Sequence, residues 1–397
     1  MSKWPMVRLD EVFALEMGKT PARDNSAYWG GDAKWASIAD IGRAGMYLEE
    51  TKESITQLAV SESGIKLVPA NTVVMSFKLS IGKTAITKEN LYTNEAIMAF
   101  HPLERGRFDL HYLYHLFSNK NWSEGSNKAV MGATLNKATL KAVKIPVPSL
   151  DEQQKIAQVL DKINEVANRT EGELAMLDQL VKSRFVEMFG DPIRNPKRLP
   201  VAKLSDLAVK ITNGTTPKGG SKVYVDQGVM FLRSQNVWKG RLELEGVAFL
   251  DVETNAKQKD SCLKNGDLLI TKTGRVNTEN SSLGRTAIYD GPDGRANING
   301  HVYLVRLKAG VPRLYVLSIL ISDSYRDHIR SVCVGGIDKR QLNLCHIENF
   351  PILQPPLALQ REFAAFVAKV DKSKFAVRKR LDKARLLYRA KLQEYFG

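Results

Sequence analysis

The chain has 397 residues, of which 43% are hydrophobic and 25% are charged, and its formal net charge is +15. This length allows two or three domains with cores of their own, and no apolar run approaches the roughly 20 residues that cross a bilayer. The N-terminus is charged within ten residues, so we expect no signal peptide, and three cysteines without a CxxC pair indicate reduced thiols in a cytoplasmic protein. A basic chain of this size favours a polyanionic partner, nucleic acid above all, with incidental basicity as the alternative.

Hydrophobic patterning predicts an α+β protein in which each of two globules is followed by a long helix. Proline-rich hinges, IPVPS and FPILQPP, precede the two long helices, and GDPIRNPKRLP links the two halves. In chain order we expect a strand at 71–77, a helix at 109–117, a long helix at 150–190, strands at 266–271 and 301–307, a helix at 313–322 and a second long helix at 357–397.

The second half of the sequence repeats the first. Residues 150–190 and 357–397 align without a gap at an offset of 207, with matches such as Gln153 to Gln360. Upstream, the order GKTP, NTVVMS, SIGKTAI in the first half recurs as GTTP, GDLLIT, SLGRTAI in the second. We therefore expect a first globule at 1–149, a central long helix at 150–190, a linker and second globule at 191–356, and a C-terminal long helix at 357–397.

Each long helix carries apolar residues at three- and four-residue steps, which is typical of a coiled-coil seam. Helices of this length need a partner, and residues 150–190 carry a net charge of −3 against +7 for residues 357–397. We expect the two helices to pair as an antiparallel, pseudo-twofold coiled coil. The predicted seam comprises Ile156, Ile163, Leu174, Leu177, Val181, Phe363, Val370, Leu381, Tyr388 and Leu392, with Val159 and Val166 placed on the same stripe.

Two Gly-Lys-Thr triplets, at Gly18 and Gly82, suggest a phosphate-binding loop. Such a loop needs another glycine five residues earlier, and Phe13 and Phe77 stand there instead. In the second copy of SIGKTAI, Arg285 replaces the lysine. The sequence therefore excludes a P-loop nucleotide site.

The whole pattern resembles the specificity (S) subunit of type I restriction–modification systems. The first half carries GKTPARDNSAYWGGDAKWASIADIG, LVPANTVVMS, TNEAIMAF and IPVPSLDEQQKIAQVL, and the second carries GTTPKGG, GDLLIT, LGRTAI and NINGHVYLVRL in the same order. The hinge PPLALQREFA departs from the family's usual Pro-Leu-x-Glu-Gln pattern. The resemblance covers essentially the whole chain.

This resemblance implies a non-catalytic reader of double-stranded DNA. Two target-recognition domains would each bind half of an asymmetric, split sequence, with the paired helices as a spacer. Two methyltransferase (M) subunits and the restriction (R) subunits would assemble on the chain. The resemblance implies no cofactor on this chain, S-adenosylmethionine on the M subunits, and ATP with magnesium on the R subunits.

The repeat also indicates where sequence specificity resides. Between Ser76 and Gly82 the first half has FKLSI, whereas between Thr271 and Gly284 the second has KTGRVNTENSSL. Matching flanks around loops of different length and chemistry are expected of two readers built on one frame. The candidates for base contacts are Lys78, Lys272, Arg275, Asn277 and Asn280, because Arg and Lys suit guanine and Asn suits adenine.

Phosphate contacts are expected from basic and hydroxyl side chains near the Gly-x-Thr-Pro turns and the repeated hairpins. The alternative for each is a solvated surface charge. The candidates are Lys19, Thr20, Arg23, Lys83, Lys128, Lys218, Lys222, Arg233, Arg285, Lys339 and Arg340.

The sequence shows no enzyme motif. No Asn-Pro-Pro-aromatic motif or glycine-rich cofactor loop is present, and His111 and His115 lack the intervening glutamate of a zincin. Two alternatives stay open beside the DNA reader: a stand-alone nuclease with a cryptic motif, and a coiled-coil scaffold whose basic charge is incidental.

Overall fold

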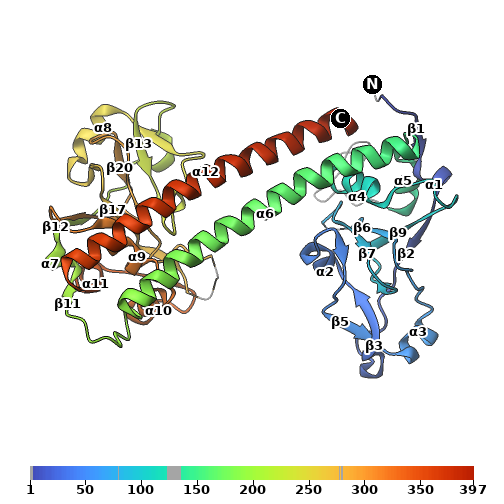
Figure 1. Ribbon diagram of the computed structural model, residues 1–397, viewed down its shortest axis with the longest axis horizontal. Coiled ribbons are helices and arrows are strands. Elements are labelled where there is room, and N and C mark those ends of the chain that lie inside the picture. Colours follow the sequence, from blue (N-terminus) through green and yellow to red (C-terminus); the bar gives the residue numbers. More distant parts are fainter. Residues whose placement is uncertain (1–2, 79, 123–135, 277, 279) are drawn as a thin grey trace. The chain divides into compact units, whose positions relative to one another are not determined.

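A computed structural model describes residues 3–78, 80–122, 136–276, 278 and 280–397 (Figure 1). The chain divides into two compact units, one formed by Met1–Glu171 with Lys379–Gly397 and the other by Gly172–Arg378. Each unit holds one mixed globule and a part of each long helix, α6 (Leu150–Phe189) and α12 (Leu357–Phe396). The predicted α+β class with two long helices is confirmed.

The first unit is built on a five-stranded sheet in the order β2-β9-β6-β7-β4, beside a smaller sheet β5-β3-β8 and the pair β1-β10. All four residues of β6 are buried, because α4 and α2 both pack on β6 and β7: Val73 and Met75 share a core with α4, and Val74 shares another with Ile41 of α2. The helices are α1 (Leu9–Val12), α2 (Ile38–Arg43), α3 (Gln57–Ser63), α4 (Leu110–Asn119) and α5 (Lys137–Ala142). The strands are β1 (Met6–Arg8), β2 (Phe13–Met17), β3 (Trp29–Ala36), β4 (Tyr47–Leu48), β5 (Glu53–Ile55), β6 (Val73–Ser76), β7 (Thr84–Thr87), β8 (Tyr92–Thr93), β9 (Ile97–Pro102) and β10 (Lys144–Pro146).

The second unit has a four-stranded sheet β12-β21-β17-β19, two three-stranded sheets β16-β13-β20 and β18-β23-β22, and the pairs β14-β15 and β11-β24. Its helices are α7 (Leu204–Leu207), α8 (Val252–Lys257), α9 (Arg313–Leu320), α10 (Asp323–Val332) and α11 (Leu344–Glu348). Its strands are β11 (Val201–Lys203), β12 (Ala208–Asn213), β13 (Val229–Leu232), β14 (Val237–Trp238), β15 (Arg241–Leu242), β16 (Ala248–Leu250), β17 (Leu268–Thr271), β18 (Thr273–Arg275), β19 (Thr286–Ile288), β20 (Ala296–Ile298), β21 (Val302–Leu307), β22 (Val334–Gly335), β23 (Lys339–Gln341) and β24 (Pro351–Leu353).

The two halves repeat each other down to single hydrogen bonds. The buried Tyr112 hydroxyl donates to the Pro146 carbonyl at 2.8 Å, and the buried Tyr315 hydroxyl donates to the Leu353 carbonyl at 3.0 Å. At the start of α6 the Gln153 side chain donates to the Pro148 carbonyl at 3.0 Å, and at the start of α12 the Gln360 side chain donates to the Pro355 carbonyl at 2.8 Å. These bonds fasten each globule to the hinge before its long helix.

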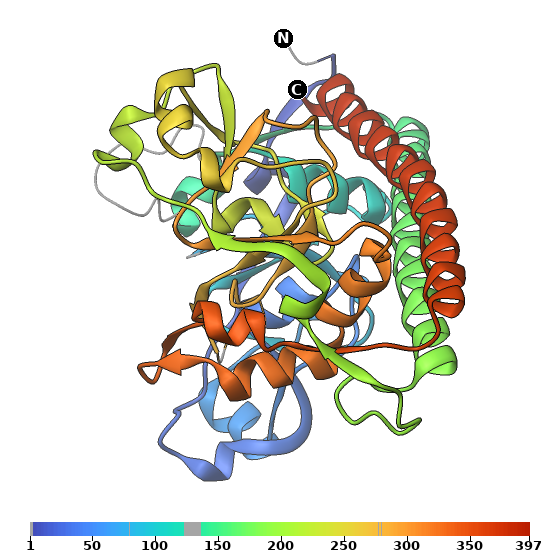
Figure 2. The same cartoon turned by 90° about the vertical axis from the view of Figure 1, so that its left-hand side faces the viewer.

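The two long helices pair antiparallel, as the contacts inside each unit establish. In the first unit the N-terminal turns of α6 pack on the C-terminal turns of α12, with Ile156 and Tyr395 in one apolar cluster. In the second unit Phe185 and Phe189, near the end of α6, contact Phe363 near the start of α12 with ring centroids 5.4 and 5.6 Å apart. The views of each unit agree that the helices lie side by side (Figure 1, Figure 2).

All ten predicted seam residues are buried or half-buried, but the wider stripe was one residue out of register in α6. Val159 and Val166 are 37% and 45% exposed, whereas Leu160 is fully buried. The sequence step after Ile156 can be counted as three or four residues, and the four-residue step to Leu160 is the one that faces α12 and α4. Val159 and Val166 are corrected to the outer face of the helix.

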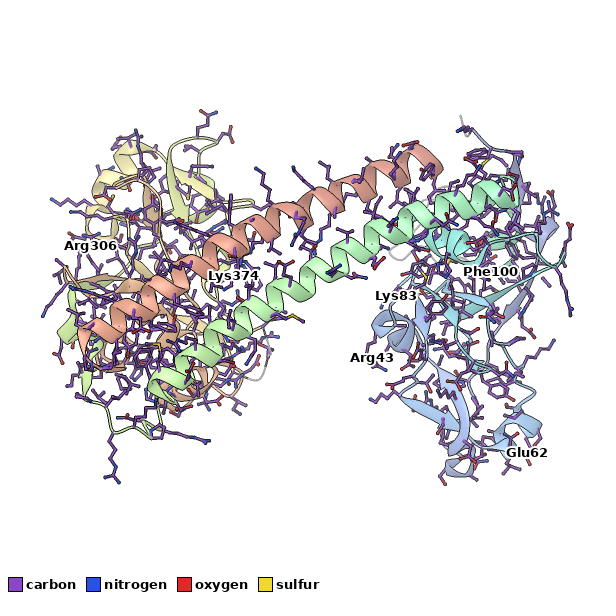
Figure 3. The ribbon with its side chains drawn as sticks, in the orientation of Figure 1. Arg43, Glu62, Lys83, Phe100, Arg306 and Lys374 are labelled. Atoms are coloured by element: carbon purple, nitrogen blue, oxygen red, sulfur yellow. The ribbon has the colours of Figure 1, made fainter. Side chains whose placement is uncertain are left out.

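Charge complementarity between the helices is also present. Arg385 of α12 pairs with Glu171 of α6 at 2.6 Å, and Lys374, labelled in Figure 3, pairs with Asp178 at 2.6 Å. The basic helix and the acidic helix therefore attract each other at the edges of the apolar seam.

Candidate nucleic-acid interface

The repeated heptapeptides form the closing end of the same β-hairpin in each unit. The hairpin in the first unit joins β6 to β7, and Gly82 N–H donates to the Ser76 carbonyl at 2.9 Å. In the second, β17 pairs with β19 and Gly284 N–H donates to the Thr271 carbonyl at 3.0 Å. Both glycines have a positive φ, +89° and +68°, which few other residues adopt. SIGKTAI and SLGRTAI are thus the frame from which a variable loop projects.

We call residues 77–81 the first variable loop and residues 272–283 the second variable loop. In the first, Phe77 is buried and the Lys78 ammonium lies 5.3 Å from the centroid of its ring. Lys78 is itself half-buried at the edge of the loop. The first variable loop thus has one basic side chain, Lys78, with which to contact DNA.

The second variable loop is long enough to contribute a strand to a separate three-stranded sheet. Its strand β18 pairs with β23, and β23 pairs with β22. This pairing sets Arg275 directly opposite Lys339 and sets Gly274 opposite Arg340. The structure therefore brings together basic candidates that are more than 60 positions apart in the sequence.

Arg275 stands at the solvent-exposed end of this small sheet. Its guanidinium pairs with Asp338 at 3.2 Å, and both side chains are about two-thirds exposed. Lys272, at the base of the loop, lies 5.9 Å above the ring of Tyr303. Both candidate base contacts remain accessible to a ligand.

Arg285 and Lys83 occupy the same place in the repeat but have different surroundings. The Arg285 guanidinium stacks on Trp238 at 3.9 Å and donates to the main-chain carbonyls of Ser281, at 2.9 Å, and Asn280. Burial, followed by the nearby cations Arg326 and Arg241, lowers the pKa of Arg285. These bonds tie the guanidinium to its own loop, which favours a positioning role over the predicted phosphate contact.

Lys83 is exposed and lies against α2. A Cβ added to Gly42 would come within 2.7 Å of the Lys83 ammonium nitrogen. Arg43 lies on the same side of the first globule (Figure 3). Among the residues that the structure describes, the Lys83 ammonium has no hydrogen-bond or ion-pair partner, so it is available for a phosphate contact.

A polar hollow of about 390 Å³ lies beside the second variable loop. Four hydroxyl side chains, two amide side chains, one indole and two guanidinium groups line it. They belong to Ser234, Gln235, Trp238, Arg275, Thr278, Asn280, Ser281, Ser282 and Arg285, and all of those from Arg275 to Ser282 are contributed by the loop itself. Its chemistry suits an anion or the edge of a nucleotide.

Gly300 and His301 of the second unit lie between the Gly-x-Thr-Pro turn and the second variable loop. In the second unit Gly300 N–H donates to Thr216 at 3.4 Å, and Lys272 N–H donates to the His301 carbonyl at 2.8 Å. Gly214 has no space for a Cβ, which would lie 2.0 Å from the Ile298 carbonyl oxygen. The turn is therefore held one segment away from the second variable loop.

The predicted phosphate residues at these turns divide into engaged and open side chains. Arg23 binds Glu53 through two bonds of 2.6 and 3.1 Å and stacks on Trp29 at 3.9 Å, which favours a structural role. Lys19 donates to the Ser63 carbonyl and Thr20 to Glu95. In the described part of the chain, by contrast, Lys218 and Lys222 are exposed and their side chains have no hydrogen-bond or ion-pair partner.

The remaining candidates are less informative. Arg233 donates to the Gly246 carbonyl at 2.8 Å and lies 5.7 Å from the ring of Tyr224. Lys339 is exposed, and Arg340 is half-buried with its Nε unbonded. Lys128 and Asn277 lie outside the described residues.

Trp238 is the main residue that the sequence reasoning missed. The alignment of Asp40 with Asn236, carried two residues further, pairs Gly42 with Trp238, and the same repeat pairs Lys83 with Arg285. Lys83 lies beside Gly42 in the first unit, and Arg285 stacks on Trp238 in the second. Reading the two substitutions together would have indicated the cation–π pair.

His111 and His115 belong to a hydrogen-bonded network in the first unit. Asp161 of α6 binds His111 Nδ1 at 2.6 Å and His115 Nε2 at 2.7 Å, and His115 Nδ1 lies 2.9 Å from the Tyr388 hydroxyl of α12. Burial alone would raise the pKa of Asp161, but the hydrogen bonds from His115 and His111 outweigh it and lower the pKa. The network fastens the globule to both long helices.

The described residues contain no group of three or more His, Cys, Asp or Glu side chains arranged to hold a metal ion. Among those residues there is also no helix with the length and apolarity that a membrane span requires.

Comparisons with known proteins agree with these features. A family model described as "Type I restriction modification DNA specificity domain" matches residues 1–177. The chain is 25% identical over 383 residues to the type I restriction enzyme MjaIX specificity subunit of Methanocaldococcus jannaschii, covering 92% of this chain and 86% of the relative. It is 32% identical over 177 residues to the EcoR124I/EcoR124II specificity subunit of Escherichia coli, covering 41% of this chain and 42% of that protein.

Two solved structures share the fold over nearly the full length of both chains. The S subunit of a type I restriction-modification system from M. genitalium has a TM-score of 0.58 at 14% identity, covering 100% of this chain and 96% of its own. A chain from a structure titled for complex assembly and conformational transition of the type I R-M system has a TM-score of 0.57 at 16% identity, covering 99% and 97%.

Proposed function

The chain belongs to the specificity subunits of type I restriction–modification systems, and from this we propose that its two globules each read one half of a bipartite, asymmetric DNA target. A specificity subunit recognises DNA sequence and is not itself catalytic, because catalysis belongs to the methyltransferase and restriction subunits. The scaffold and stand-alone nuclease alternatives have no support from the relatives.

One observation supports the two-reader proposal most strongly. The same hairpin, closed by the same hydrogen bonds at Gly82 and Gly284, carries a five-residue loop in one unit and a twelve-residue loop in the other. A frame that is held constant while the projecting loop differs can present two different sets of base contacts. The difference predicts two unlike half-sites.

In the second half-site we propose that Arg275 makes the principal base contact. It is exposed, it stands at the end of β18, and its pairing with exposed Asp338 is weak enough for a guanine edge to replace it. Lys272 and Asn280 are the secondary candidates there, together with Asn277. Lys78 is the candidate in the first half-site.

Phosphate contacts are proposed for the open cations around these loops, namely Lys83, Lys218, Lys222, Lys339 and Arg340. Arg23 and Arg285 are better explained as positioning residues, because carboxylate or carbonyl oxygens already accept their hydrogen bonds. Lys19, Thr20, Lys128 and Arg233 stay as secondary candidates.

We further propose that two methyltransferase subunits dock on the outer faces of the long helices. Exposed apolar side chains on α6 and α12 offer such a surface, since large apolar groups on a helix exterior mark interaction sites when they gather. They include Met176, Leu180, Val186, Phe375, Leu386 and Leu387. Restriction subunits would join this complex.

The proposed organisation is a target-recognition domain at 1–149, a helix at 150–190, a linker and second target-recognition domain at 191–356, and a closing helix at 357–397. S-adenosylmethionine on the methyltransferase subunits and ATP with magnesium on the restriction subunits would supply the chemistry. The complex would act on DNA in the cytoplasm.

The proposal is tested by purifying the chain together with its methyltransferase subunits and sequencing the adenines that the complex methylates in genomic DNA. We expect a bipartite motif with a fixed gap, and salt-dependent binding that is tighter to duplexes carrying it than to scrambled duplexes. Binding that does not distinguish the duplexes would support a scaffold, and metal-dependent cleavage by the isolated chain would support a nuclease.

A further inference from the structure

The turn between β22 and β23 presents the most exposed large apolar side chain of the described residues. Ile337 is 90% exposed, compared with 41% for Val334 on the same hairpin. Single exposed apolar residues are common on protein surfaces, so exposure by itself assigns nothing to Ile337. A role for Ile337 follows from its position at the end of the β18-β23-β22 sheet.

The hairpin that carries Ile337 is joined to the second variable loop. Strand β23, which follows the turn, pairs with β18, and Arg275 is opposite Lys339 in this pairing. Asp338, the neighbour of Ile337, forms the ion pair with Arg275. Ile337 therefore extends beyond the same sheet end that presents the proposed base contact.

The backbone of the turn is built for a tight projection. Gly335 has a φ of +127°, and a Cβ at this position would lie 2.9 Å from the Lys339 carbonyl oxygen. No Cβ-bearing residue fits there without a shift of the strand. Glycine thus allows the chain to reverse sharply and leaves Ile337 at its tip.

Charge identifies the kind of partner that Ile337 meets. Asp338 follows Ile337 and pairs with Arg275, and Lys339 and Arg340 come next in the chain. Arg275 and Lys272 lie on the neighbouring strand and loop. Four cations against one carboxylate near the apolar tip leave a net positive charge, which fits the negative backbone of DNA on either side of a base step better than it fits an apolar protein surface. Proteins that distort DNA use this combination, with an aliphatic side chain inserted between base pairs and basic residues on the flanking phosphates.

We propose that Ile337 inserts between two base pairs of the second half-site and partly unstacks them. The proposal rests on the proposed function and adds a residue that reads the deformability of a base step as well as its hydrogen-bonding edges. Pyrimidine–purine steps, which unstack most easily, are the expected targets. The first half-site is not expected to show the same distortion from this residue.

The test uses the full chain in complex with its methyltransferase subunits and duplexes carrying its methylation motif. 2-Aminopurine is placed in turn at each adenine of the second half-site, where unstacking raises its fluorescence. We expect a severalfold rise at one step with the wild-type complex, the loss of that rise with Ile337→Ala, and binding about tenfold weaker for this variant.

Two variants serve as matched controls. Ile337→Leu keeps an aliphatic wedge and should keep both the fluorescence and the affinity, and Val334→Ala removes an exposed apolar group from the same hairpin without affecting either. A mismatch at the responding step should restore much of the affinity of Ile337→Ala, because the cost of unstacking has already been met.

Unchanged fluorescence and affinity for Ile337→Ala would overturn the proposal. So would a loss of affinity that thymine-to-uracil replacement reproduces without any fluorescence change, which would mark a methyl contact in the major groove. Reduced recovery of methyltransferase subunits with the variant would mark a protein contact. If the wild-type complex bound motif and scrambled duplexes equally, the proposed function itself would fall, and the wedge with it.

Discussion

The two halves of the chain share a frame but differ at two places, the variable loop and the junction between globule and long helices. At the junction, the first unit uses the network around Asp161, whereas the repeat places Leu314, Ser318, Ala368 and Val181 at the positions of His111, His115, Asp161 and Tyr388. Both halves keep the tyrosine that fastens α4 or α9 to the hinge. The frame is thus held by the same hydrogen bonds to main-chain carbonyls in both halves, while the side chains that attach to the long helices or read DNA can change independently.

The largest effect is expected at the hydrogen-bonded network around Asp161, which only the first unit has. Asp161→Ala leaves two imidazoles without their shared acceptor, and His115 is fully buried. We expect the first unit to lose about 2–3 kcal/mol of unfolding free energy, measured by urea denaturation. Glu165→Ala, on an exposed face of the same helix, should change this free energy by less than about 0.5 kcal/mol. Equal losses for Asp161→Ala and Glu165→Ala would show that the Asp161 network does not stabilise the first unit.

The next effect concerns the basic residue that stands at the same position in the two hairpins, Lys83 in the first and Arg285 in the second. Arg285→Ala removes the stack on Trp238 and two bonds to the loop, so binding to the complete target should weaken by about 2 kcal/mol, or roughly thirtyfold. Arg285→Lys should not restore it, because an ammonium cannot make the same planar contacts.

Lys83→Ala is the matched variant in the first unit. It should weaken binding only two- to threefold, about equally for all sequences, and lower the salt slope by roughly one. Titrations at several salt concentrations distinguish the two behaviours. If Arg285→Ala instead behaved like Lys83→Ala, both residues would be phosphate contacts.

A smaller, directional effect is expected at Arg275. Replacement by Ala should cost about 1.5 kcal/mol against the wild-type target and relax the preference at one position of the second half-site. Competition binding with single-base variants of both half-sites measures this. Lys339→Ala, directly across the sheet, should weaken all targets alike; a uniform loss for Arg275→Ala would reassign it to the backbone.

The smallest effect is a pH dependence in the second unit. Hydrogen bonds from Lys239 and Lys182 lower the pKa of Asp323 from its ordinary 3.8 to about 2. Because the folded-state pKa is lowered, the stabilisation is complete above about pH 4 and is lost as the pH falls towards 2. The side chain is 70% exposed, so solvent screening limits the contribution to about 0.5 kcal/mol.

Asp323→Asn removes this dependence. Wild-type protein should therefore lose slightly more unfolding free energy than the variant between pH 7 and pH 2.5. Parallel curves for the two proteins would show that the pair of lysines does not stabilise the fold.

The sequence predicted the features that local patterns determine. The strand at 71–77, the helix at 109–117 and both long helices agree with β6, α4, α6 and α12, because apolar spacing and proline hinges act over short distances. The choice between Val159 and Leu160 failed, since it depends on what the helix packs against.

Contacts between segments that lie far apart in the chain were not predicted from the sequence. Nothing local to Arg275 indicates that β23 will pair beside it, and nothing near Asp161 indicates two histidines some 50 residues earlier. The same holds for Ile337, whose exposure depends on the turn of a hairpin that the sequence did not predict. Pairings of this kind are set by the tertiary structure, so local sequence patterns do not reveal a site that is assembled from them.

The claim that each hairpin loop reads its own half-site is tested most directly by replacing residues 272–283 with residues 77–81 and sequencing the methylated adenines. The two frames close with matching hydrogen bonds, so the second unit should accept the shorter loop. We predict a motif whose first half-site and gap are unchanged and whose second half-site is new. An unchanged motif, or changes in both half-sites, would contradict the account.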